Sequence, residues 1–172
     1  MDRNSRYILL WLACMAAQIF FFDHLMLSVW LNPLVYVTFI VLLPLETAPV
    51  AVLGYGLLTG LTADLLTGAG GLNTLSTLPV AYLRRPLIEW LNGKDGQHDN
   101  GIPSRYRLGN VFYFSYLAAL VVLHHTIFFA FESLSWVQLP YTLLRIVASA
   151  VITIAFATAV NRIILPETPG AL

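Results

Sequence analysis

The residues of this chain that could do chemistry are a few ionisable side chains inside long apolar runs. Asp64 and Arg145 each lie within such a run, and His124 and His125 are adjacent in a third. A carboxylate inside a membrane span costs about 2.5–3.5 kcal/mol on insertion scales, so it requires a partner or water nearby. These four residues are therefore the candidates for a buried ion pair, a proton or ion site, or a metal site.

The positions of Asp64 and Arg145 favour an ion pair. Each residue lies near the predicted outer end of its apolar run, and at about 1.5 Å of rise per helical residue the two side chains should lie at similar depths. We predict a buried Asp64–Arg145 ion pair, direct or bridged by water. Proton or ion handling by Asp64 is the alternative, although that function ordinarily uses a longer relay of acidic groups.

The sequence gives little support to metal binding or catalysis. Adjacent histidines point about 100° apart on a helix, so His124 and His125 cannot readily ligate one ion. There is no Gly-x-Ser-x-Gly elbow, no His-Glu-x-x-His motif and no phosphate-binding glycine loop with its lysine. We therefore expect no catalytic residue, no metal and no cofactor, and we expect that the chain is not an enzyme.

The composition is that of a membrane protein. Hydrophobic residues make up 58% of the 172 residues and charged residues only 10%, which is far more apolar than a soluble domain. At about 20 residues for each crossing, a chain of this length has room for one bundle and no separate soluble domain. The formal net charge of zero argues against a nucleic-acid partner, which would require a basic excess. Residues 1–172 are thus expected to form a single integral membrane domain.

Six apolar segments predict an all-α membrane protein with six transmembrane helices in one compact bundle. The segments cover roughly residues 7–22, 29–45, 48–66, 72–91, 111–131 and 139–164, and a polar loop spans 92–110. The second segment is the least regular, because Pro33 and Pro44 bracket its most apolar stretch. A re-entrant or interfacial segment could also produce such a pattern.

The distribution of basic residues favours six crossings and sets the orientation. If all six segments cross from a cytoplasmic N-terminus, the inner side holds Arg3, Arg6, Arg84, Arg85, Lys94, Arg105, Arg107 and Arg162. The outer loops would then hold no Lys or Arg, as the positive-inside rule requires, whereas five crossings would put the basic loop 92–110 outside. We predict cytoplasmic N- and C-termini and a cytoplasmic basic boundary, near which Glu89 can be paired and solvated. The boundary consists of Arg84, Arg85, Lys94, Arg105 and Arg107.

Small residues repeat at helical spacing in three of the predicted spans. Gly56 and Gly60 recur four residues apart with Asp64 on the same face, which lets a neighbouring backbone approach closely. The other two stripes are Ala13 with Ala17, and Ser149 with Thr153 and Ala157. We expect these faces to pack against helices of the bundle or to dock a partner helix. Gln18 must also find a hydrogen-bond partner inside the bundle or on another subunit, because lipid offers none.

The order of these features resembles the rod shape-determining protein MreD family, and most closely its Bacteroidetes-type branch. The resemblance runs from about residue 7 to 164, except for the loop 92–110. It rests on the basic N-terminus, Gln18, Leu-Asn-Pro-Leu-Val-Tyr-Val-Thr-Phe-Ile-Val-Leu-Leu-Pro at 31–44, Gly60-x-x-x-Asp64, Gly71-Leu72-Asn73 and Tyr82-Leu83-Arg84-Arg85-Pro86.

The resemblance implies a non-enzymatic component of the bacterial inner membrane that acts in cell elongation. Such a protein binds the bitopic scaffold MreC and, through it, the MreB filament and the peptidoglycan synthase pair, a SEDS glycosyltransferase with a class B penicillin-binding protein. The family is similar in fold to the S-components of energy-coupling-factor transporters. A vitamin-binding S-component is therefore the alternative, and it would need convergent polar side chains around an outward cavity, for which Asn73, Thr74, Ser76 and Thr77 are candidates.

Overall fold

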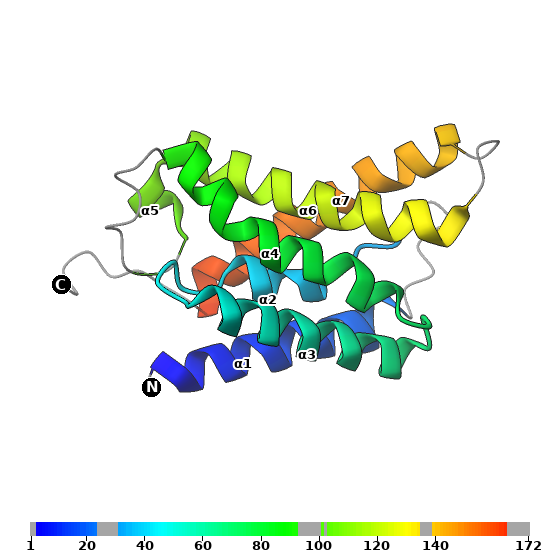
Figure 1. Ribbon diagram of the computed structural model, residues 1–172, viewed down its shortest axis with the longest axis horizontal. Coiled ribbons are helices and arrows are strands. Elements are labelled where there is room, and N and C mark those ends of the chain that lie inside the picture. Colours follow the sequence, from blue (N-terminus) through cyan, green and yellow to red (C-terminus); the bar gives the residue numbers. More distant parts are fainter. Residues whose placement is uncertain (1–2, 24–30, 93–100, 102, 135–138, 165–172) are drawn as a thin grey trace.

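The computed structural model describes residues 3–23, 31–92, 101, 103–134 and 139–164, and the regular structure in these ranges is helical (Figure 1). Helix α1 (Arg3–Ala16) continues into a short π-helical turn, η1 (Ala17–Phe22). The remaining long helices lie roughly along one direction in Figure 1. They are α3 (Pro49–Thr67), α4 (Leu72–Asn92), α6 (Asn110–Ser133) and α7 (Leu139–Ile164), and the short α5 (Arg105–Leu108) precedes α6.

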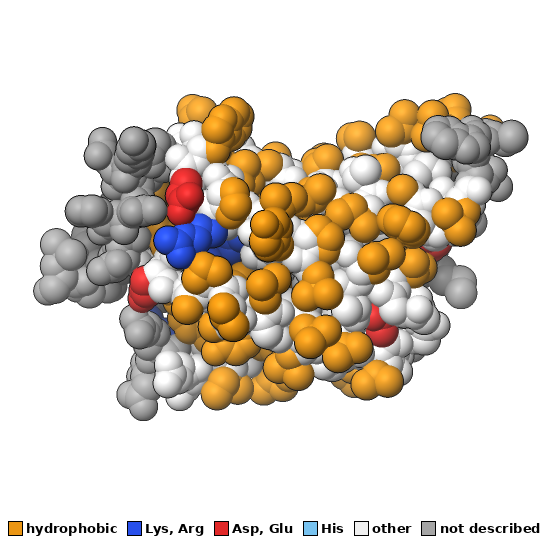
Figure 2. Space-filling view, viewed as in Figure 1, with side chains coloured by type: hydrophobic (Ala, Val, Ile, Leu, Met, Phe, Trp, Pro, Cys, Tyr) orange, Lys and Arg blue, Asp and Glu red, His pale blue; other side chains and the backbone are white. Residues whose placement is uncertain are grey.

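Four of these helical stretches are long and apolar enough to cross a membrane: Asn4–Phe22, Pro49–Thr67, Asn110–Ser133 and Leu139–Ile164. They correspond to the first, third, fifth and sixth predicted spans. Their outward side chains are largely apolar, and Figure 2 shows hydrophobic side chains across most of one face of the molecule. The charged side chains visible on that face gather mainly toward the end at which α4 finishes. Such a surface is consistent with a membrane protein.

Helix α4 has the length of a span but a more polar composition than the four stretches above. Its inward face carries the buried residues Asn73, Ser76, Thr77 and Arg84. The pyrrolidine rings of Pro79 and Pro86 also lie within it, and each lacks the N–H that would bond to the preceding turn. The helix therefore brings polar groups into the interior, which explains why hydropathy alone ranks it below the others.

The second predicted span is wrong as a continuous helix over 29–45. Its described part has no regular structure from residue 31 to 34, then a 3₁₀ turn, η2 (Val35–Val37), and a single α-turn, α2 (Thr38–Val41). The chain then runs irregularly to α3, so the stretch passes back along the bundle from the end of η1 to the start of α3 (Figure 1). Side chains 33 to 43 are all buried. The proline-bracketed stretch is thus the core of the fold rather than a lipid-facing span.

The long helices surround this buried stretch. Helix α3 packs along α4, α4 along α6, and α6 along α7, while α1 contacts η2, α2 and α7. The main apolar core joins Ile40 and Leu42 of the stretch to Leu10 of α1 and to Tyr116 and Leu117 of α6. This central stretch, residues 31–45, therefore holds α1 to the rest of the bundle.

The turn between α3 and α4 is tight because three glycines adopt positive φ angles. Gly68 ends α3 at φ 71°, and Gly70 and Gly71 follow at 62° and 99°. L-residues with a Cβ rarely adopt these conformations, whereas glycine adopts them at no steric cost. The N-terminus of α4 consequently folds back onto the last turns of α3, which places Asp64 beside it.

Candidate functional site

Asp64 caps the N-terminus of α4. Its Oδ1 accepts a hydrogen bond from the backbone N–H of Asn73 at 2.9 Å, and its Oδ2 accepts from the N–H of Thr74 at 2.9 Å and the Thr74 hydroxyl at 2.6 Å. The first N–H groups of a helix lack intrahelical partners and carry partial positive charge, so they stabilise a carboxylate. This arrangement supplies Asp64 with donors without a cationic side chain.

The predicted Asp64–Arg145 ion pair is therefore corrected. Arg145 Nη1 pairs with Glu132 Oε2 at 2.8 Å, at the junction between the end of α6 and the start of α7. Its guanidinium also lies 4.5 Å from the centre of the Phe129 ring, within the range of a cation–π contact. Glu132 lies near the end of α6, the helix that precedes α7, and is therefore closer to Arg145 in sequence than Asp64 is. Glu132, and not Asp64, is the carboxylate that pairs with Arg145.

Exchanging charges between partners tests this correction. We expect the double substitution Asp64→Arg with Arg145→Asp to fail to restore the folding lost in Asp64→Arg, because the two residues do not share a contact that the exchange could rebuild. The exchange Glu132→Arg with Arg145→Glu should recover most of the melting temperature that either single change loses. Thermal unfolding in detergent measures both sets, and rescue of the first pair would contradict the assignment of partners.

The irregular backbone of residues 31–37 is stabilised by polar side chains from three other elements. Within the described residues, three of its N–H groups donate to them: Asn32 to Ser149 Oγ of α7 at 3.1 Å, Leu34 to His125 Nε2 of α6 at 3.4 Å, and Val35 to Gln18 Oε1 of η1 at 2.7 Å. Unpaired backbone groups at membrane depth cost several kcal/mol each, so non-helical backbone persists there only when protein groups pair with it. Gln18, His125 and Ser149 thus supply acceptors that this stretch requires.

The hydrogen bonds of His125 define its tautomer. Nδ1 lies 2.8 Å from the carbonyl oxygen of Val121, which can only accept, so Nδ1 carries the proton. Nε2 is then the acceptor for the Leu34 N–H and for the Thr153 hydroxyl at 3.3 Å. A neutral imidazole with this proton position meets each of these contacts, and the ring acts as a structural acceptor.

Loss of one such acceptor should destabilise the bundle measurably. In Gln18→Leu the Val35 N–H loses its partner in a buried site, and we expect the free energy of unfolding to fall by about 1–3 kcal/mol. Thr62→Val is the matched control, because the Thr62 hydroxyl is exposed and bonds only to the Leu58 carbonyl of its own helix. Equal stability of the two variants in denaturant titrations would show that Gln18 does not support the stretch.

His124 is the centre of a second buried network, between the central stretch and α4. Its Nε2 lies 2.9 Å from the Tyr36 hydroxyl, 3.1 Å from Ser76 Oγ and 3.4 Å from Thr77 Oγ1. The Tyr36 hydroxyl donates to Asn73 Oδ1 at 3.0 Å, the Ser76 hydroxyl to the backbone carbonyls of Leu72 and Asn73, and the Thr77 hydroxyl to the Asn73 carbonyl. Because these three hydroxyl protons are already donated, Nε2 of His124 carries a proton and is the donor in its contacts. Its Nδ1 then carries a lone pair with no partner among the described residues.

The polar side chains expected to line an outward cavity are therefore used inside the bundle. Asn73, Ser76 and Thr77 are buried and hydrogen-bonded to one another, to Tyr36 or to His124, and Thr74 binds Asp64. Sequence reasoning missed Tyr36 as their partner. The signal available was a tyrosine inside a proline-bracketed apolar run, where its hydroxyl needs a polar partner.

The other end of the central stretch is held by Arg84. Its Nη2 donates to the carbonyl oxygens of Leu43 and Pro44, and its Nε donates to the Tyr116 hydroxyl at 2.9 Å. Tyr116 in turn donates to the Val41 carbonyl at 2.8 Å. The Arg84 side chain is 2% exposed. Its guanidinium thus donates to backbone carbonyls that lie beyond the end of α2, in an irregular part of the chain.

The predicted basic boundary is consequently divided. Arg84 is buried in the core, whereas Arg85 next to it forms an exposed ion pair with Glu89 at 2.9 Å. Arg105 lies 5.8 Å from the centre of the Phe114 ring. Lys94 and the side chain of Arg107 lie outside the described residues.

The predicted small-residue faces lie largely inside the bundle. A Cβ at Gly60 would come within 2.6 Å of the Thr74 Cα, and one at Gly56 within 2.9 Å of the Ala81 Cβ, so the backbones of α3 and α4 are in close contact. The α7 stripe is buried, and Ala13 and Ala17 are half-buried. That α7 stripe consists of Ser149, Thr153 and Ala157.

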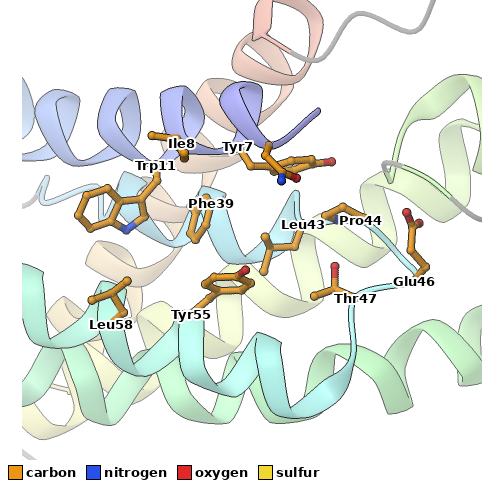
Figure 3. Close-up of a pocket in the computed structure, with 11 residues that line it drawn as sticks. Tyr7, Ile8, Trp11, Phe39, Leu43, Pro44, Glu46, Thr47, Tyr55 and Leu58 are labelled. Carbon is orange, nitrogen blue, oxygen red and sulfur yellow. The ribbon is translucent and has the colours of Figure 1, made fainter. Parts of the chain in front are cut away.

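A lateral groove opens between α1 and α3, with the central stretch behind it (Figure 3). Its volume is about 590 Å³. Figure 3 shows Trp11 and Leu58 at one end, Glu46 and Thr47 at the other, and Phe39 between the ends. The remaining lining residues are Asn4, Tyr7, Ile8, Leu43, Pro44 and Tyr55. A ligand or a partner could occupy this groove.

Comparisons with protein-family models, with curated proteins and with solved structures find no match to this chain. Within the described residues, no group of three or more His, Cys, Asp or Glu side chains could hold a metal ion. The candidate site must therefore be interpreted from its own chemistry. Its described part offers several buried hydrogen-bond networks, a largely apolar exterior and a lateral groove.

Proposed function

We propose that this chain is a non-enzymatic component of the inner membrane of a rod-shaped bacterium, where it docks an MreC-type bitopic scaffold. Through that scaffold it would act on the MreB filament and the peptidoglycan synthase, and so on cell shape. The order of the motifs from Gln18 to Pro86 is the resemblance on which the proposal rests. The protein's role in this view is to hold partner helices, rather than to transform a substrate.

The use of the polar side chains supports this proposal most directly. Ser149, His125, Gln18 and Arg84 bind the backbone of the central stretch, and Asp64 binds the N-terminus of α4. These groups are thus committed to the fold itself. What the chain presents to its surroundings is mainly apolar helix faces, which suit packing against other membrane helices.

We also propose that the chain forms one domain that crosses the membrane six times, with both termini in the cytoplasm. The positive-inside pattern supports this threading, and the stretch 31–48 would be the second pass. Irregular backbone at membrane depth is tolerated where it is buried in protein, as residues 33–43 are here. In a Cys14→Ala background, a cysteine at position 98 should resist a membrane-impermeant thiol reagent added to intact cells. Rapid labelling would overturn the threading.

Site-specific photo-crosslinking tests the proposed partner. Photoreactive residues placed one at a time on the exposed faces of α1, α3, α6 and α7 should capture a bitopic, coiled-coil scaffold from at least one of these faces. Position 117, which is fully buried, is the matched control and should capture nothing. Suitable exposed positions are Leu12, Leu61, Val122 and Val151.

The outcome separates the proposal from its alternative. Capture of the scaffold, together with loss of rod shape when the protein is depleted, supports the shape-complex function. Capture of an ATPase module and its coupling subunit would support a vitamin transporter S-component instead. In that case a small ligand would also have to displace the hydrogen bonds that Asn73 and Thr77 make with Tyr36 and with the α4 backbone.

A further inference from the structure

A short segment before α5 is bonded to two other elements at one end of the bundle. It consists of Gly101, Pro103 and Ser104, which we name the strap. Helix α5 lies at the same end as the last turn of α7 and the start of α3 (Figure 1). Pro103 and Ser104 are buried. This part of the polar stretch 92–110 is therefore packed against the bundle.

The first anchor of the strap is the end of the central stretch. The Leu45 N–H donates to the Gly101 carbonyl at 2.7 Å, and the Gly101 N–H donates to Glu46 Oε2 at 2.7 Å. Both backbone polar groups of Gly101 are thus bonded. Its φ of 131° is a conformation that residues with a Cβ rarely adopt, so this anchor requires glycine.

The second anchor of the strap is the last turn of α7. Asn161 Nδ2 donates to the Pro103 carbonyl at 2.8 Å and to the Tyr113 hydroxyl of α6 at 3.3 Å. Asn161 is only 7% exposed, and a buried amide that loses a partner costs free energy. The contact with the strap therefore explains an asparagine on the inward face of a largely apolar helix.

We propose that the strap is a conformational device that makes the end of the central stretch and the last turn of α7 open and close together. Both anchors hold the same short piece of backbone, so release of one removes a constraint on the other. The groove between α1 and α3 would respond as well, because Glu46 lines it and bonds to Gly101. An event at this end of the bundle that moves Gly101 would thus reach both the groove and α7. The inference does not depend on the identity of any protein partner.

Hydrogen exchange of backbone amides in detergent tests the coupling. Amides exchange through local opening, so the rate of exchange reports the opening equilibrium. Coupling between two sites is reciprocal, and each anchor should therefore respond when the other is broken. Asn161→Ala should speed exchange of the Leu45 amide about tenfold, the equivalent of one hydrogen bond. Gly101→Ala should speed exchange of residues 161–164 by a similar factor, although Gly101 bonds to Leu45 and Glu46.

Tyr113→Phe is the matched control for Asn161→Ala. It removes the other acceptor of the Asn161 amide and leaves the bond to Pro103, so exchange of the Leu45 amide should not change. The Asn73 amide, which donates to Asp64 at the other end of α4, is the internal reference and should exchange at one rate in all variants.

Two outcomes would overturn the proposal. If each substitution speeds exchange only at its own anchor, the two anchors open independently. If Tyr113→Phe speeds exchange of the Leu45 amide as much as Asn161→Ala does, the coupling runs through the main apolar core, against which Leu45 and Ile164 both pack.

A milder pair of variants applies if exchange of the Asn73 amide also rises in Gly101→Ala, since that variant would then have lost its fold. Glu46→Leu removes the side-chain acceptor of the Gly101 N–H, whereas Glu46→Gln keeps an oxygen acceptor. Faster exchange of residues 161–164 in Glu46→Leu than in Glu46→Gln supports the strap. Equal exchange in the two variants overturns it.

Discussion

Replacing Arg84 by methionine should lower the free energy of unfolding by about 3 kcal/mol. Methionine keeps an apolar stem but removes the donor to the buried carbonyl of Leu43 and one of the two donors to the part-buried carbonyl of Pro44, which also accepts the Thr47 N–H at 3.2 Å. A buried acceptor left unsatisfied costs about 1–3 kcal/mol, so most of the loss arises at Leu43. The Tyr116 hydroxyl can still donate to Val41, so the loss is concentrated at the end of the central stretch.

Arg85→Met is the matched control for this prediction. The Arg85 side chain is 58% exposed and pairs with Glu89 across one helical turn, so its loss should change stability by less than about 1 kcal/mol. Denaturant titration of both variants in the same detergent measures the difference. Similar midpoints would show that Arg84 is a boundary cation, as the positive-inside pattern alone suggests. Arg84→Lys should recover only part of the loss, because an ammonium cannot reproduce the planar fork of donors.

The long helices could be predicted from local sequence. The segments expected at 48–66, 72–91, 111–131 and 139–164 match helices α3, α4, α6 and α7 within a few residues. Three of them are long apolar runs, in which a helix satisfies the backbone hydrogen bonds within the segment itself. The segment expected at 29–45 does not match. There the backbone is satisfied by Gln18, Arg84, His125 and Ser149 from distant elements, and no local pattern reports such contacts.

The sequence indicated which ionisable side chains would be buried more reliably than it indicated their partners. Opposite charges at similar predicted depths suggested that Asp64 pairs with Arg145. In the structure the N–H and the hydroxyl of Thr74, at the N-terminus of α4, donate to Asp64 instead. The signal that could have found it is the glycine-rich turn at 68–71, which returns the chain so that Asn73 and Thr74 come beside Asp64. Arg145 had a nearer carboxylate in Glu132, across the short connection between α6 and α7. Charge matching in membranes therefore has to consider helix termini together with side chains.

A methyl group added to Gly60 should also destabilise the bundle strongly. In Gly60→Ala the new Cβ would lie 2.6 Å from the Thr74 Cα, which is backbone and cannot rotate away. The helices α3 and α4 would have to separate, at a cost of about 1–3 kcal/mol. Separation would also lengthen the hydrogen bonds from Thr74 to Asp64, because Gly60 and Asp64 lie one turn apart on the same face.

Gly54 provides the matched control on the same helix. A Cβ there would meet nothing within 4 Å, so Gly54→Ala should raise stability by about 0.5–1 kcal/mol through the better helix propensity of alanine. The stability of Gly56→Ala should lie between those of Gly54→Ala and Gly60→Ala, because the added Cβ would lie 2.9 Å from the methyl group of Ala81. Combining Gly56→Ala with Ala81→Gly should restore part of the lost stability. Thermal unfolding of the three single variants gives the order. If Gly60→Ala were as stable as Gly54→Ala, the close approach of α3 and α4 would be wrong. The glycine face would then be free to dock a helix from another protein, so this one comparison decides between internal packing and partner binding at Gly56 and Gly60.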